Sequence, residues 1–128
     1  MKIIQGRASG PSDKRSATFT GDVWADPVLA PTDGVTINHV MFTPGARTHW
    51  HSHSRGQVLV VTSGEGRAGD DAGEVRAIRA GDVVLFEPGE RHWHGAAPES
   101  FMAHLAISIG EHDWQEPVED ADYTKAPS

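Results

Sequence analysis

Short apolar runs separated by Gly, Pro and Asp dominate the chain and predict β-strands rather than helices. Val35–Phe42 alternates and ends at a Pro-Gly turn, and the Val-Leu-Val-Val run after Gln57 predicts a buried strand over residues 57–62. Residues 63–73 are rich in Gly and Asp, so we expect a hairpin loop there. Further strands are expected over residues 48–53, 75–78, 83–86, 91–95 and 101–109.

This spacing of short strands predicts an all-β sandwich or barrel, because no helical period occurs before residue 110. We expect one domain over residues 1–128, with a core at about 35–110 and N-terminal strands or an arm over 1–34. Residues 111–128 are acidic and turn-rich, and they are expected to form a tail with a short helix or an arm.

Charge and cysteine content narrow the functional classes. The chain has 11 Lys and Arg against 18 Asp and Glu, and the net charge of −7 disfavours nucleic acid or an anionic membrane as a partner. There is no cysteine, which excludes disulfides, thiolate metal ligands and a cysteine nucleophile. No apolar run suits a signal peptide or a membrane span, so a cytoplasmic location is expected.

Eight histidines are unusual for 128 residues, and most of them fall in two segments. His51 and His53 are two residues apart, so on a strand both rings project from one face. Gln57 follows a short connection, and His92 follows a Pro-Gly turn. Three imidazoles and a carboxamide oxygen suit a divalent Mn, Fe, Co, Ni or Zn ion and leave room for substrate. The alternative is a metal-free barrel with hydrogen-bonded core histidines.

These motifs resemble those of the cupin family. Residues 45–64 are similar to the first cupin motif, with Gln57 where Glu is usual, and residues 81–92 resemble the second. Nearly the whole chain is similar to a group of small bacterial cupins that includes manganese-dependent hydroxynitrile lyases. The resemblance implies a single-domain cupin barrel (a double-stranded β-helix or jelly roll) with Mn(II), or else Fe(II), Zn(II), Ni(II) or Co(II), at His51, His53, Gln57 and His92.

The same resemblance implies roles for two further histidines. His94 and His104 match, by position, the histidines near the metal of those lyases, where one takes the hydroxyl proton of a cyanohydrin. Each also has a structural interpretation, because histidines beside a metal site often only orient a ligand or fill a hydrogen bond. A neutral Gln57 leaves the ion its full charge, which favours Lewis-acid chemistry over iron redox chemistry.

A substrate pocket for a small molecule is expected beside these groups. Asn38, Val40 and Phe42 share one strand face, and Met102 lies on the last strand. Trp50 and Trp93 adjoin metal ligands and therefore point to the opposite side, where packing is the expected role.

Three functions remain open on the sequence. The first is a metal-dependent hydroxynitrile lyase, the second an Fe(II) or Mn(II) dioxygenase that cleaves C–C bonds, and the third a non-catalytic metal-binding or small-molecule-binding cupin. The resembling group also implies a homodimer or homotetramer, with residues 3–19 and the C-terminal arm as contacts.

Overall fold

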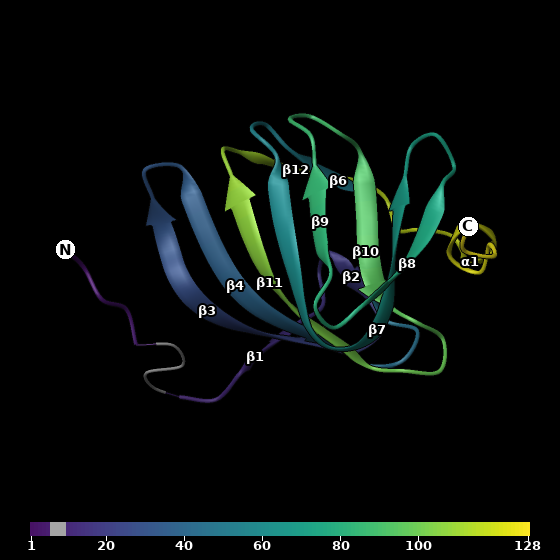
Figure 1. Cartoon of the computed structure of the whole chain (residues 1–128), viewed down its shortest axis with the longest axis horizontal. Coiled ribbons are helices and arrows are strands. Elements are labelled where there is room, and N and C mark those ends of the chain that lie inside the picture. Colours follow the sequence, from purple (N-terminus) through teal and green to yellow (C-terminus); the bar gives the residue numbers. More distant parts are fainter. Residues whose placement is uncertain (6–9) are drawn as a thin grey trace.

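A computed structural model describes residues 1–5 and 10–128, so part of the expected contact segment at residues 3–19 lies outside the described residues. Almost all regular structure is β-strand (Figure 1). The strands are β1 (Asp13–Arg15), β2 (Phe19–Thr20), β3 (Val23–Thr32), β4 (Val35–Phe42), β5 (Arg47–Thr48), β6 (His51–His53), β7 (Gln57–Asp70), β8 (Val75–Arg79), β9 (Val83–Phe86), β10 (His92–Ala96), β11 (Met102–Ile109) and β12 (His112–Trp114). One helix, α1 (Asp120–Tyr123), follows.

The strands form a nearly closed antiparallel barrel in the order β1-β3-β4-β11-β7-β10-β5-β2. Strand β9 pairs with the first half of β7, and β8 pairs with its second half. Strand β6 lies between β10 and β12. The all-β cupin barrel expected from the sequence is therefore confirmed.

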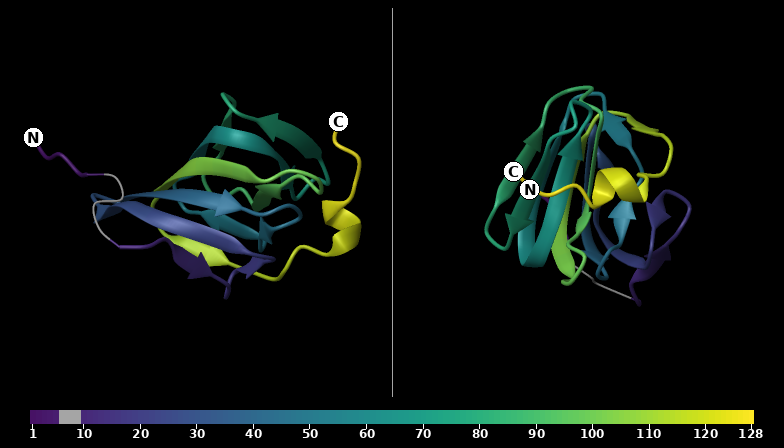
Figure 2. Two further views of the ribbon diagram at one scale, coloured as in Figure 1. Left: turned by 90° about the horizontal axis from the view of Figure 1, so that it is seen from below. Right: turned by 90° about the vertical axis from the view of Figure 1, so that its right-hand side faces the viewer.

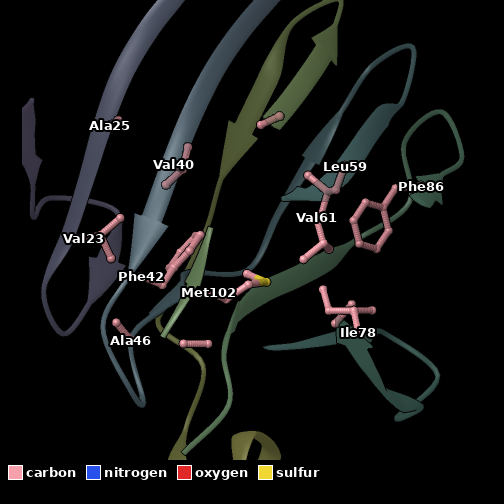
Figure 3. Close-up of a cluster of buried hydrophobic side chains, with 13 residues drawn as sticks. Val23, Ala25, Val40, Phe42, Ala46, Leu59, Val61, Ile78, Phe86 and Met102 are labelled. Carbon is pink, nitrogen blue, oxygen red and sulfur yellow. The ribbon is translucent and has the colours of Figure 1, made fainter. Parts of the chain in front are cut away.

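The core lies inside the barrel, where alternate residues of the strands meet. Side chains such as Phe42, Leu59 and Met102 point toward one another from β4, β7 and β11 (Figure 3). Strand β3, within the segment assigned to the N-terminal strands, pairs with β4 and adds Val23 and Ala25 to this core. Alternation on these strands produces the inward apolar face that the sequence pattern predicted.

The prediction of a hairpin loop over residues 63–73 is wrong, because β7 continues to Asp70. The glycines read as loop residues lie within the strand at points of close approach. A Cβ on Gly66 would collide with the Met102 side chain, and one on Gly69 would collide with the Trp93 ring. Gly64 has a φ of 75° and pairs with Met102, one position before the register shift between Ala103 and His104. Glycine in this strand thus permits packing and a bulge rather than a turn.

The C-terminal segment with α1 lies beside the barrel (Figure 2). A second apolar cluster joins residues of this segment to the strands. It contains Trp50, Val75, Trp93, Val118 and Tyr123, which confirms the packing role expected for the two tryptophans. The Tyr123 hydroxyl donates to the Ala96 carbonyl at 2.6 Å and fixes α1 against β10.

Arginines attach this C-terminal segment to the barrel. The buried Arg47 guanidinium donates to the Val118 carbonyl and to Asp120, each at 2.8 Å. In the described part of the chain, no helix is long and apolar enough to cross a membrane.

Candidate metal centre

Three histidines from two paired neighbouring strands meet inside the barrel. Strand β6 places His51 and His53 on one face, and His92 of β10 lies directly opposite His51 in the strand register. One ring nitrogen from each of the three lies within 4.8 Å of the others, and all three residues are buried. This triad is consistent with a divalent metal.

Backbone carbonyls fix two of these rings. His51 Nδ1 donates to the His49 carbonyl at 2.9 Å, and His92 Nδ1 donates to the Glu90 carbonyl at 2.8 Å. Because a carbonyl only accepts, the proton of each neutral ring is on Nδ1 and the Nε2 lone pair points inward. His51 Nε2 and both ring nitrogens of His53 are buried without a hydrogen-bond partner. Such unpaired atoms cost about 1–3 kcal/mol each, which a bound cation would offset.

Gln57, the first residue of β7, lies beside the triad. Its amide Nε2 donates to Ser108 Oγ at 3.0 Å, and its Oε1 lies 2.9 Å from His92 Nε2. With His92 protonated on Nδ1, two lone pairs face each other across this gap. Ligands at about 2.1 Å from a metal are about 3 Å apart at adjacent octahedral positions, so the spacing fits a shared cation.

Burial keeps these imidazoles neutral. It lowers the pKa of His51 to about 3, with a further lowering from nearby His92. Burial likewise lowers the pKa of His53 and of His92 to about 4. Nearby His51 lowers the pKa of His53 further, and nearby His53 does the same for His92. Neutral imidazole is the form that binds a metal, so the ligand set is ready well below neutral pH.

A second histidine pair lies deeper in the barrel. His104 Nε2 is 3.0 Å from His94 Nδ1, and His94 Nε2 and His104 Nδ1 have no other hydrogen-bond partner. The ring centroids of His94 and His51 are 5.2 Å apart. The ring centroids of Phe42 and His104 are also 5.2 Å apart. Burial lowers the pKa of His104 to about 3 and that of His94 well below its usual value, with a further lowering of the His94 pKa from His104.

One cavity of about 920 Å³ connects the two histidine groups. Of the residues expected at the site, its walls include His51, His53, Gln57, His94, His104, Asn38, Val40 and Phe42. Two expected residues do not line it. His92 lies behind the wall, stacked on Phe86 with ring centroids 3.5 Å apart. Met102 is fully buried in the core, because its sulfur packs into the space left by Gly66.

Trp114 and Thr48 are among the wall residues that the sequence did not predict. The Trp114 ring lies 4.4 Å from the His51 ring, because β12 pairs with β6 and places Trp114 opposite His51. The Thr48 hydroxyl accepts the His94 backbone N–H at 3.2 Å. No local pattern around Trp114 indicates that the C-terminal segment returns to the histidine triad.

Comparisons with known proteins agree with this geometry. The cupin domain family matches residues 38–109. An (R)-mandelonitrile lyase from Granulicella tundricola is 46% identical to this chain and covers 94% of it and 94% of its own length.

Two solved structures extend the comparison to the fold. A cupin-like protein from Thermotoga maritima has a TM-score of 0.81 at 37% identity, over 99% of this chain and 98% of that one. A predicted oxalate decarboxylase from the same organism, at 20% identity, covers 86% of this chain and 100% of its own with a TM-score of 0.75 and shares the fold alone. By its barrel, its two histidine motifs and these matches, the chain belongs to the cupin family.

Proposed function

We propose that the chain is a metal-dependent hydroxynitrile lyase, which splits a cyanohydrin into an aldehyde and hydrogen cyanide. The observation that carries this proposal is the His94–His104 pair, which opens into the same cavity as the triad of His51, His53 and His92. The 46% identity to a mandelonitrile lyase supports the same reaction.

His51, His53, Gln57 and His92 would hold the ion, and we propose Mn(II). Their neutral nitrogen and oxygen donors suit a divalent ion of borderline hardness, and no carboxylate reduces its charge. When bound, the ion supplies positive charge that lowers the pKa of a nearby hydroxyl group. Ser108 holds the Gln57 amide so that its oxygen, rather than its nitrogen, points to the ligand histidines.

His94 is the proposed base. If its Nδ1 carries the proton and donates to His104 Nε2, the His94 Nε2 lone pair is free to accept the hydroxyl proton of the cyanohydrin. As the hydroxyl oxygen becomes the aldehyde oxygen, the bond between the carbinol and nitrile carbons breaks and its electron pair leaves with cyanide. The lowered His94 pKa favours return of the proton, so His94 then gives it to cyanide.

The cavity wall supplies the binding surface for the rest of the substrate. Phe42, Val40 and Trp114 provide apolar area suited to an aromatic aldehyde. Phe42 also excludes water from the side of His104 that it covers.

Benzaldehyde release from mandelonitrile, measured without oxygen, tests this proposal. Metal-free protein is compared with protein reloaded with Mn(II), and we expect release above the buffer rate only in the reloaded sample. No release from either sample would contradict it, and oxygen uptake with Fe(II) would then identify the dioxygenase alternative. If neither assay shows turnover while the ion still raises the melting temperature, the non-catalytic alternative is correct.

Assembly of the barrel into a homodimer or homotetramer stays a prediction. Light scattering on the eluted protein measures it directly.

A further inference from the structure

The volume of the cavity exceeds that of a small aromatic cyanohydrin. Its volume of about 920 Å³ is near the upper end of the roughly 300–1,000 Å³ typical of sites for drug-sized ligands. Beyond the metal centre, its walls continue to residues 14–18 and to Thr36 and Asn38. The natural substrate therefore has room for a part that extends away from the reacting hydroxyl.

The strand register points one arginine into that outer part. Strand β1 pairs with β3 so that Arg15 lies opposite Val23, and Lys14 lies opposite Trp24. Val23 is fully buried in the core, so Arg15 is on the interior face and Lys14 on the exterior one. The Lys14 ammonium accordingly lies 5.5 Å from the exterior Trp24 ring. Both residues contribute to the cavity wall, where Arg15 is half-buried and Lys14 is exposed.

Among residues 1–5 and 10–128, the Arg15 guanidinium has no counterion. Asp22 pairs with Lys14 at 3.3 Å, but no described residue forms an ion pair or a side-chain hydrogen bond with Arg15. Within residues 1–5 and 10–128 the cavity wall includes two cationic residues, Arg15 and Lys14, and of these only Lys14 forms an ion pair. The exposed Glu111 is the single carboxylate of that wall in the same part of the chain. An unpaired guanidinium facing a cavity is suited to bind a carboxylate through two parallel hydrogen bonds.

The position of Arg15 relates this charge to the reacting groups. Val23, its partner across β3, pairs in turn with Phe42 of β4. Two strand spacings, about 10 Å, therefore separate the Arg15 and Phe42 backbones. The Phe42 ring contacts the rings of both His94 and His104. A ring lying along Phe42 would have its hydroxyl end near His94 and its far end toward Arg15.

We propose that the β1 end of the cavity is an anion subsite in which Arg15 binds a carboxylate. The substrate class is then an aromatic aldehyde, or its cyanohydrin, that carries a carboxylate remote from the reacting carbon. The cyanohydrin part of this assignment rests on the proposed lyase function, whereas the carboxylate part does not.

Calorimetric titration of the metal-loaded protein with two aldehydes tests the subsite without turnover. The probes are 4-formylbenzoate and its neutral methyl ester. We expect the wild type to bind the carboxylate about tenfold more tightly than the ester, because charge-assisted hydrogen bonds are strong. Arg15→Gln should remove this preference, and Arg15→Lys should retain part of it. Arg79→Gln is the charge-matched control, since Arg79 is exposed and does not line the cavity.

Equal binding of the two aldehydes by the wild type would overturn the subsite, as would a preference that persists in Arg15→Gln. The kcat/KM ratio of the two corresponding cyanohydrins separates this failure from failure of the lyase. A carboxylate preference in binding with neither cyanohydrin cleaved keeps the subsite and rejects the lyase. Cleavage of both cyanohydrins without any preference rejects the subsite alone.

Discussion

The barrel contains two groups of buried histidines, an outer group of His51, His53 and His92 and an inner group of His94 and His104. Burial lowers the pKa values of both groups, but their hydrogen bonds differ. In the outer group, carbonyls two residues upstream hold Nδ1 of His51 and His92. In the inner group, His94 and His104 contact each other at 3.0 Å, and no backbone carbonyl holds the ring nitrogens of His94.

This difference separates two uses of neutral imidazole. A carbonyl anchor fixes one tautomer, so the opposite nitrogen permanently presents a lone pair, as a metal ligand must. A histidine–histidine hydrogen bond allows either ring to carry the shared proton, which suits proton transfer. Burial alone therefore does not determine the role of a histidine. The hydrogen-bond partner of its second ring nitrogen determines that role.

The largest effect is expected from removing an outer histidine. His53→Ala deletes a ring whose nitrogens have no other partner, and metal affinity should fall by more than the about 10–100-fold that loss of an outer-shell contact costs. Lyase activity should fall to the buffer rate. Metal content by mass spectrometry checks this result, with His39→Ala as the control because His39 lies outside the cavity wall. Full metal retention in His53→Ala would show that the ligand assignment is wrong.

Removing an inner histidine should separate turnover from metal binding. His94→Ala is expected to keep the metal and to lose about 10²–10⁴-fold in kcat, the usual contribution of a general base. Steady-state kinetics and metal analysis on the same preparation measure both quantities. Unchanged turnover would move the base to His104.

Both groups should make the metal-free barrel sensitive to acid. Their pKa values lie below the 6.5 of an unfolded histidine, so the unfolded chain binds more protons once the pH drops below that value. The free energy of unfolding is then complete above pH 6.5 and declines toward pH 4, by up to about 1.4 kcal/mol per pH unit for each histidine. Urea unfolding at several pH values measures this slope. A free energy that is constant between pH 7 and pH 5 would contradict it.

The smallest effect is expected at Ser108, a residue of the cavity wall that holds the Gln57 amide. Ser108→Ala removes the acceptor that orients the Gln57 amide, and metal affinity should fall by about tenfold. Ser108→Thr keeps a hydroxyl and should stay near the wild type. Competition with a chelator of known affinity distinguishes the two variants, and equal loss in both would indicate a packing effect instead.

Local spacing was enough to predict that His51 and His53 lie side by side, because they share one short strand, whereas His92 was added only by the resemblance of residues 81–92 to the second cupin motif. It was not enough for groups that depend on register between distant strands. Trp114 reaches His51 only because β12 pairs with β6, and Ser108 reaches Gln57 only because β11 pairs with β7. The prediction of a loop was wrong because the glycines of β7 leave space for side chains of β10 and β11 rather than forming a turn.

Strand β7 has a consequence for how the barrel opens. Its first half pairs with β9 and β11, and its second half pairs with β8 and β10, so neither half has a free edge. An amide proton of β7 that is bonded to the interior strand β11 can exchange with solvent only when that pairing opens, at a cost close to the free energy of global unfolding. Edge strands such as β1 can exchange through local openings. Since Gln57 is the first residue of β7, the slowest-exchanging part of the molecule begins at the metal centre.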